Sequence, residues 1–341
     1  MKLIRTEDAV GHVLCHDMTQ IIKDKYKDAR FRKGHVVTEE DIPVLLSMGK
    51  EHLYVWEMTP GMVHENDAAE RLLTLCGQEN MLRSEVKEGK IELKAACDGV
   101  FLVDSQRLIA VNSQEEVMIA TRKGGTAVRA GDKLAGMRVI PLIIAEEKLQ
   151  KAEQAAGDKP LLSLKPYVRK TACIVATGGE VKKGLIQDTF TPVVIDKLRT
   201  YGIETLEVVY SGDGVENVRD AVLAMRERKP DMILCTGGMS VDPDDNTPGG
   251  IRAAGADIVC YGAPVLPGAM FLLGYFDNGT PVMGLPGCVM YAGATVFDLV
   301  LPRLMAGEIL TEEDMNCLGE GGLCLNCPQC TFPNCGFGKG R

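Results

Sequence analysis

From Lys170 onward, short apolar runs alternate with segments whose apolar residues recur at helical spacing. The runs predict strands and the segments between them predict helices, an alternation typical of βαβ units around a mostly parallel sheet. The predicted strands are 171–177, 205–210, 231–236 and 256–260, and the predicted helices are 191–201, 215–228 and a short one from 247. We therefore expect an α/β domain with a doubly wound, mostly parallel sheet over residues 168–310.

Three local signals complete this domain. Two apolar runs flank Asn278-Gly279, a dipeptide that favours a hairpin turn. The pairs Thr191-Pro192 and Thr247-Pro248 predict helix starts, with the threonine as N-cap and the proline at the first helical position. A last helix is expected over residues 288–305.

Before residue 168 the pattern is different. Helical spacing over 39–48 and 66–77, with an apolar run at 52–56 between them, predicts a small α+β region over residues 1–80. Residues 88–145 contain apolar runs separated by glycine-bearing turns, which predicts a β-rich module.

A charged, alanine-rich segment follows the β-rich module. It spans residues 145–160 and ends in Gly157 and Pro160, which predicts an exposed helix followed by a linker over 146–167. A domain boundary is therefore expected near residue 165.

Composition narrows the class of protein. A chain of 341 residues is too long for one hydrophobic core, so several domains are expected. No run reaches the roughly 20 apolar residues of a membrane helix, and the first residues lack the apolar stretch of a signal peptide. A net charge of −9 disfavours binding to nucleic-acid phosphates. These features predict a cytoplasmic protein that binds neither membranes nor nucleic acid.

Three glycine-bearing turns follow three of the predicted strands, at 176–180, 235–248 and 284–288. In an open α/β sheet, ligands lie beyond the carboxyl ends of the strands, where glycine lets backbone N–H groups approach an anion. One such turn can serve chain reversal alone, whereas three indicate a binding site. The candidate binding residues are Thr177, Gly178, Gly179, Thr236, Gly237, Gly238, Ser240, Pro286 and Gly287.

Carboxylates crowd the second turn. Asp242, Asp244 and Asp245 lie just before the helix start at Thr247. Acids beside a phosphate site repel the phosphate unless a divalent cation bridges them, which indicates a magnesium-dependent phosphoryl or nucleotidyl reaction. The alternative is that these acids cap the following helix and complement its dipole.

These motifs together resemble the molybdopterin-binding domain shared by molybdopterin adenylyltransferases and molybdopterin molybdotransferases. The segment TGGMSVDPDDNTP is similar to the adenylyltransferase pattern, which has TGG followed by Pro-x-Asp-x-Thr-Pro. TGGE and GLPG are closer to the molybdotransferase branch, and residues 31–56 are similar to an N-terminal segment of that branch. Gly179 and Cys288-Val289 depart from its Asp and Asn-Pro, and Pro243 falls where that branch has an aspartate.

The resemblance implies a function in molybdenum-cofactor biosynthesis. It implies molybdopterin as substrate, with Mg²⁺ and ATP or an adenylate, in adenylyl transfer or molybdate insertion. Asp245 would hold magnesium or position the adenylate, and Glu180 and Asp242 would join it as catalytic residues. Molybdate, a second copy of the chain in a homodimer, and molybdoenzymes or other cofactor-biosynthesis proteins are the implied partners. The alternative function is a non-catalytic carrier or sensor of molybdopterin or the finished cofactor.

Five of the twelve cysteines crowd the C-terminus, in residues 317–341. Cys324, Cys327, Cys330 and Cys335 lie within one short segment, and ionised thiols at such spacing repel one another unless a metal holds them. Zinc and an iron–sulfur cluster are both compatible with this spacing. The alternatives are reversible disulfides or a disordered thiol tail. Glycines at 319, 321 and 322 predict a flexible joint before this Cys-rich, metal-binding tail.

Overall fold

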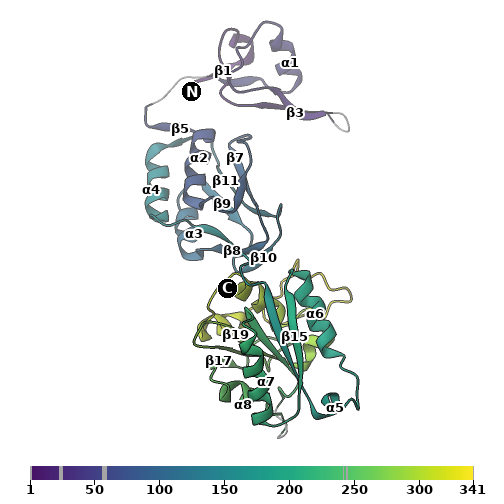
Figure 1. The fold of residues 1–341 in the computed structure, drawn as a ribbon. Helices are drawn as coiled ribbons and strands as arrows, with labels where there is room; N and C mark the ends of the chain where they lie inside the picture. Colours follow the sequence, from purple (N-terminus) through teal and green to yellow (C-terminus); the bar gives the residue numbers. More distant parts are fainter. Residues whose placement is uncertain (1, 23–25, 56–59, 241, 243–244, 341) are drawn as a thin grey trace. The chain divides into compact units, whose positions relative to one another are not determined.

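The computed structural model describes the whole chain except residues 1, 23–25, 56–59, 241, 243–244 and 341. Pro243, Asp244 and Trp56 therefore lie outside the described residues. The chain forms two compact units (Figure 1). The first unit comprises Met1–Ala96, Leu102–Gly124 and Ala130–Leu164, and the second comprises Cys97–Phe101, Gly125–Arg129 and Lys165–Arg341.

The second unit is built on a six-stranded sheet whose order is β15-β14-β16-β19-β18-β17. Its strands are β14 (Thr171–Thr177), β15 (Glu204–Ser211), β16 (Met232–Thr236), β17 (Asp257–Tyr261), β18 (Leu272–Tyr275) and β19 (Pro281–Leu285). The neighbours β15, β14, β16 and β19 are parallel, whereas β18 runs antiparallel to β17 and β19. The predicted mostly parallel α/β fold is confirmed.

Helices flank this sheet. They are α5 (Gly179–Lys182), α6 (Phe190–Thr200), α7 (Val215–Glu227), α8 (Thr247–Ala253), α9 (Val296–Met305) and α10 (Glu312–Asn316), with 3-10 turns η2 (Gly287–Met290) and η3 (Cys317–Gly319). Residues of β16 are buried along the whole strand, as expected for a central parallel strand covered on both faces. One core cluster joins Val218 and Val222 of α7 to Ile233 and Cys235 of β16.

The helix starts differ from the predictions. Thr191 and Thr247 lie inside the first turns of α6 and α8 rather than at their N-caps, and both side chains are buried. The N–H groups of Phe190 and Thr191 donate instead to Oδ1 of Asp188. The last helix is shorter than predicted, because η2 ends at Met290 and α9 begins only after the capping box of Thr295.

The amino-terminal part of the first unit packs small elements around one apolar cluster. These elements are β1 (Lys2–Arg5), η1 (Thr6–Asp8), β2 (Met18–Ile22), β3 (Tyr26–Phe31), α1 (Asp41–Ser47) and β4 (His52–Val55). β1 pairs with β4 and β2 pairs with β3, both antiparallel. Leu14, Leu45 and Leu53 form the centre of the cluster.

The rest of the first unit combines an antiparallel sheet with helices. The sheet order is β6-β7-β11-β9, from Met81–Arg83, Lys90–Ala95, Lys133–Val139 and Val117–Thr121. The helices are α2 (Glu65–Cys76), α3 (Ser105–Asn112) and α4 (Glu146–Ala156), and the short strands are β5 (Met62–His64) and β12 (Ile143–Ala145). Of the three remaining strands, β10 (Thr126–Val128) belongs to the second unit, and β8 (Gly99–Val103) and β13 (Leu162–Pro166) each have residues in both units. α3 and β13 were not predicted from the sequence.

The helix predicted as exposed is packed on one face. Leu149, Ala152 and Ala156 of α4 are buried. Its polar side is held by Arg71 of α2, which forms ion pairs with Glu146 and Glu153 at 2.8 and 2.7 Å. The alanine-rich, charged sequence of α4 therefore indicates a helix with a narrow apolar stripe. This stripe still packs against the rest of the unit.

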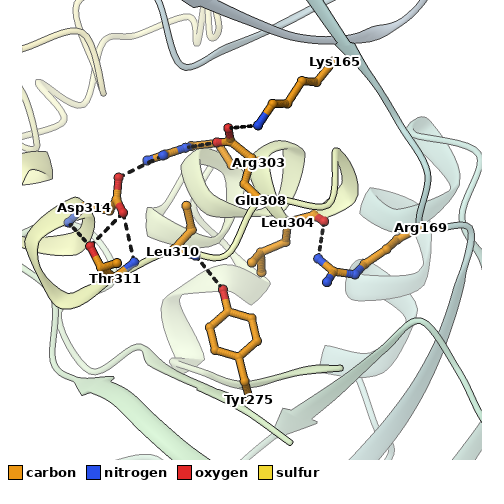
Figure 2. Close-up of polar contacts among 9 residues, drawn as sticks. All are labelled: Lys165, Arg169, Tyr275, Arg303, Leu304, Glu308, Leu310, Thr311 and Asp314. Carbon is orange, nitrogen blue, oxygen red and sulfur yellow. Dashed lines mark hydrogen bonds and ion pairs between the residues drawn. The ribbon is translucent and has the colours of Figure 1, made fainter. Parts of the chain in front are cut away.

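A polar network holds the chain that leaves α9 (Figure 2). Arg303 forms ion pairs with Glu308 at 2.8 Å and with Asp314 at 2.9 Å, and Lys165 reaches Glu308 at 3.0 Å. The hydroxyl of Tyr275 accepts a hydrogen bond from the N–H of Leu310. The network fastens α10 near the amino-terminal edge of the sheet, where β19 begins.

Acid should weaken this network through Asp314. Burial alone would raise the pKa of Asp314, but hydrogen bonds from Thr311 and Arg303 outweigh it and lower the pKa. A carboxylate whose pKa is lower in the folded state stabilises the fold above its unfolded pKa of about 4, and this contribution is lost as the pH falls through the folded pKa. Asp314→Asn should therefore destabilise the protein at pH 7 and cost progressively less below pH of about 4.

Urea unfolding followed by circular dichroism at several pH values measures this difference. Asp196→Asn is the matched control, because Asp196 is an exposed carboxylate whose ion pair among the described residues is with the exposed Arg199. A loss of stability in Asp314→Asn that stays constant down to pH 2 would show that its charge does not hold α10.

Every helix in the described part of the chain is too short or too polar to cross a lipid bilayer.

Candidate functional site

The three predicted glycine turns meet at the carboxyl-terminal edge of the parallel strands. Ala176 of β14 is in register with Thr236 of β16, and Thr236 is in register with Leu285 of β19. The turns that follow these strands therefore begin side by side. The structure brings together the first, second and third turns, as the sequence predicted from the strand ends.

Three threonines lock the first two turns to each other. The Thr177 hydroxyl lies 3.0 Å from the carbonyl oxygen of Thr236 and 3.0 Å from the hydroxyl of Thr247. All three side chains are buried. Because buried hydroxyls need partners, this arrangement fixes the spacing between β14, β16 and the start of α8.

The glycines of the second turn are required by space and by conformation. A Cβ atom on Gly237 would collide with the carbonyl oxygen of Thr177, and one on Gly238 would lie 2.6 Å from Oγ1 of Thr247. The φ angles are +82° at Gly237 and +56° at Gly238. Only glycine accepts both constraints without strain.

Asp245 closes the loop that follows this turn. Its Oδ2 accepts a hydrogen bond of 2.7 Å from the N–H of Ser240, and its own N–H donates to the carbonyl of Asp242. Ser240 and Asp242 are exposed, and Asp245 is half-buried. Burial and the charge of Asp245 raise the pKa of Tyr261, whose hydroxyl donates to the carbonyl of Met239. The carboxylate of Asp245 therefore has a structural role in this loop.

The first turn already holds a carboxylate. The N–H of Gly179 donates to Oδ2 of Asp213 at 2.8 Å, and the N–H of Gly178 donates to the carbonyl of Ser211. Glu180 lies in the first turn of α5 and is exposed. An anion would have to displace Asp213 to reach the N–H of Gly179, so the second turn is the more open anion site.

The third turn lies beside the start of α6. The Thr189 hydroxyl lies 3.2 Å from the sulfur of Met290 in η2, the 3-10 turn that begins at Gly287. A Cβ atom on Gly287 would meet no atom of the described residues within 4 Å. The turn after Pro286 therefore borders open space on the side of Gly287.

Two polar atoms at the start of α6 were not identified from the sequence. Asp188 Oδ2 and Thr191 Oγ1 are buried and have no hydrogen-bond partner among the described residues. Burial raises the pKa of Tyr210, as do the charge of Asp188 and a side-chain hydrogen bond with it, so the Tyr210 hydroxyl lies near this carboxylate. Buried atoms of this kind usually mark a site for a ligand or water. The sequence does contain a signal for this site, because Asp188 lies two residues before the start of α6. It was overlooked because the Thr-Pro pair predicted that the helix begins at Thr191.

A cavity of about 520 Å³ lies elsewhere, at the amino-terminal edge of the sheet. Asp257, Tyr275 and Gly279 line it together with Leu310 and Glu312. This cavity opens beside the Arg303 network of Figure 2, at the opposite end of the strands from the glycine turns. Its place in the fold does not fit a phosphate site, because it lies away from all three glycine turns.

The Cys-rich tail packs against the domain, so the predicted flexible joint is wrong. The N–H of Leu266 donates to the carbonyl of Gly322, and the N–H of Cys324 donates to the carbonyl of Leu266. Phe337 is buried. The thiol of Cys330 lies against Gly293, which follows η2. Among the described residues, no three His, Cys, Asp or Glu side chains converge as metal ligands, in the tail or at Asp245.

Two parts of the chain match known protein families. Residues 173–306 match a family model described as a probable molybdopterin binding domain, and residues 3–57 match one described as a domain of unknown function. The resemblance predicted from the glycine turns is therefore confirmed by this match, which covers residues 173–306.

Individual relatives are similar over shorter stretches or at lower identity. The CinA-like protein of Mycobacterium tuberculosis is 34% identical over 80 residues, which cover 24% of this chain and 19% of that protein. The MoaB molybdopterin biosynthesis enzyme of Thermus thermophilus is 19% identical, with a TM-score of 0.33, over 41% of this chain and 98% of its own. The protein CinA of unknown function from Thermoplasma acidophilum is 20% identical, with a TM-score of 0.32, over 35% and 89%. The chain thus covers about a fifth of the curated relatives' length.

Proposed function

We propose that the C-terminal domain binds molybdopterin or its adenylate at the carboxyl-terminal edge of the sheet, in molybdenum-cofactor biosynthesis. The observation that carries this proposal is the second glycine turn. Among the described residues, the N–H groups of Gly237 and Gly238 donate no hydrogen bond, and both glycines are half-buried. Fixed, unused N–H groups at a strand end are suited to the phosphate of a ligand.

The pterin would lie on the other side of the same edge. Asp188 Oδ2 and Thr191 Oγ1 are one acceptor and one hydroxyl with no partner in the described part of the chain, and a pterin ring offers N–H donors and ring acceptors to such groups. The open space beside Gly287 adjoins the start of α6. The phosphate would then bind the N–H groups of Gly237 and Gly238. The pterin would lie between Asp188 and Gly287, where it can bind the side-chain oxygens that have no partner among the described residues.

The second turn also fits a magnesium ion. Oδ2 of Asp245 is used by the N–H of Ser240, whereas Oδ1 accepts no hydrogen bond from the described residues. Magnesium is usually held by one or two carboxylates together with water and substrate phosphates, so a protein-only ligand trio is not needed. Asp245, joined by the exposed Asp242, would hold the ion, which would neutralise charge on the phosphates.

The reaction proposed for this site is adenylyl transfer or the later release of AMP as molybdate is inserted. In the first, a terminal phosphate oxygen of molybdopterin bonds to the α-phosphorus of ATP, and pyrophosphate leaves. Such transfers need positioning and charge neutralisation more than covalent catalysis. Gly237 and Gly238 would position the phosphate, and Glu180, exposed in the first turn of α5, would border the nucleotide side.

A carrier or sensor function is the second candidate. The hydrogen bonds of Asp245 to the Ser240 loop favour it, because they give this acid a structural role that needs no magnesium. Mass spectrometry of the protein mixed with molybdopterin, Mg²⁺-ATP and molybdate separates the candidates. Adenylate or AMP supports the transferase, binding without either product supports the carrier, and absence of binding contradicts both.

Gly287→Ala should weaken molybdopterin binding by about tenfold, since one methyl group placed in a ligand's space commonly costs about 1–3 kcal/mol. The added Cβ meets no atom of the described residues, so the fold itself should tolerate it. Equilibrium binding by fluorescence quenching of the pterin measures the effect.

Gly136→Ala is the matched control for this variant. Gly136 lies in β11 of the first unit, and its Cβ would meet neighbours only at 3.9 Å and beyond. Equal affinity in Gly287→Ala and Gly136→Ala would place the pterin away from the third turn.

A further inference from the structure

The four clustered cysteines lie in a loop whose ends are tied together. The N–H of Gly338 donates to the carbonyl of Gly321 at 3.0 Å, and all four cysteines lie between these residues. We call residues 322–337 the thiol loop. Because its ends are already closed, the entropy cost of gathering its thiols is smaller than in a free tail.

Both ends of the thiol loop are also fastened to the α/β domain. At one end, the N–H of Leu266 donates to Gly322 and the N–H of Cys324 donates to Leu266, each at 2.8 Å, and Leu266 forms a parallel bridge with Leu323. At the other end Phe337 is 5% exposed and packs edge-on against Phe332 of the same loop, and the adjoining Gly338 lies against the Leu299 side chain of α9. The thiol loop is therefore an ordered part of the domain surface.

The backbone turns between successive cysteines. Asn326, between Cys324 and Cys327, has a φ of +52°, a left-handed conformation that few non-glycine residues adopt. Between Cys330 and Cys335, the N–H of Asn334 donates to the carbonyl of Thr331. The hydrogen bond from Asn334 to Thr331 closes a turn in the segment between Cys330 and Cys335.

The loop thiols differ in setting from the core thiols. Burial raises the pKa of Cys76 and of Cys235 to about 12 each, so these remain protonated and are unsuited to bind metal at neutral pH. Cys327 and Cys330 are exposed, and Cys324 and Cys335 are half-buried. A metal ion in solution can reach the loop thiols without opening the core.

We propose that the thiol loop binds a thiolate-liganded metal centre, either one zinc ion or an iron–sulfur cluster, through Cys324, Cys327, Cys330 and Cys335. Each thiol that becomes a ligand releases its proton to water. No three of these side chains converge in the described residues, so they must turn inward as the metal binds. None of the proposed ligands belongs to the glycine turns, so metal binding and molybdopterin binding can be measured separately.

The test uses the full chain, purified without oxygen and analysed for zinc, iron and acid-labile sulfide. The metal-free protein is then titrated with Zn²⁺ alone, or treated with ferrous iron and sulfide. We expect about one zinc per chain at four thiolates, or iron with matching sulfide. Cys327→Ser with Cys330→Ser should lower the bound metal or its affinity by about tenfold or more.

The matched control removes two thiols outside the loop, through Cys97→Ser with Cys317→Ser. Cys317 is exposed and Cys97 is half-buried, so both pairs of changes spare the core. The control should keep its metal. Circular dichroism establishes that each variant folds. No metal in the wild type under either treatment, or equal metal in both variants, would overturn the proposal.

A further variant tests the closed geometry. Phe337→Ala keeps every thiol but removes the buried anchor at one end of the loop, so zinc affinity should fall by about tenfold as ordering entropy is added to binding. Zinc affinity equal to that of the wild type would show that the thiols act as an unstructured chelator, and the contribution of the closed loop to metal binding would be rejected.

Discussion

Asp245→Asn should lower adenylate-forming or AMP-releasing turnover by about a hundredfold or more, while molybdopterin affinity changes far less. The asparagine side-chain oxygen can still accept the hydrogen bond from the N–H of Ser240, so the loop should keep its shape. Only the negative charge is lost. A carboxylate that holds magnesium acts mainly on charge that develops in the transition state, which is why turnover should fall more than binding.

The measurement is the initial rate of adenylate or AMP production over a range of Mg²⁺ concentrations. Asp220→Asn is the matched control, because it removes the same charge from an exposed position on α7 of the same domain. If Asp245→Asn turns over at the wild-type rate with an unchanged Mg²⁺ dependence, Asp245 only closes the Ser240 loop. Tight binding by a wild type that yields neither product would instead support the carrier.

Gly237→Ala should destabilise the C-terminal domain by about 3 kcal/mol, from the left-handed backbone and a steric collision together. The φ of Gly237 is +82°, and its added Cβ would collide with a backbone carbonyl oxygen, that of Thr177, which cannot rotate away. Relieving this collision would require β14 and β16 to move apart, which would break the hydrogen bond between Thr177 and Thr236. Urea unfolding followed by circular dichroism measures the loss.

Gly279→Ala separates the two causes. Gly279 has a nearly equal φ of +78°, but its Cβ would meet no atom of the described residues within 4 Å. This control should lose only about 1 kcal/mol, the cost of the left-handed conformation. Similar losses in both variants would mean that the turn at Gly237 relaxes, and that the close approach of Thr177 does not fix it.

The strands and helices of the C-terminal domain could be predicted because their signals are local. Residues 171–177 and 232–236 are apolar runs, and the observed strands β14 and β16 coincide with the predicted ones or start within one residue. α3 was missed because Ser105–Asn112 is short and has an apolar run that resembles the strands around it. Only packing against α4 and β9 makes it a helix.

The glycine turns could be located in the sequence, but the sequence did not show which of their N–H groups are already hydrogen-bonded within the protein. Sequence placed Gly179 and Gly237 in equivalent turns, whereas the structure shows the N–H of Gly179 occupied by Asp213, which follows β15. Likewise, Thr247 was predicted as a cap and is instead a buried partner of Thr177. Each contact joins residues far apart in the chain, and no local pattern contains it.

The sequence by itself determined the alternation of strands and helices in the C-terminal domain, the place of the three glycine turns and the crowding of thiols after Cys317. Hydrophobic spacing and glycine conformation act within a few residues, so they can be read along the chain. Tertiary structure alone decided which N–H groups stay open, that Asp188 and Thr191 keep polar atoms with no partner among the described residues, and that the thiol loop is closed. These depend on burial and on long-range contacts, because a polar atom becomes available to a ligand only when the fold removes its other partners.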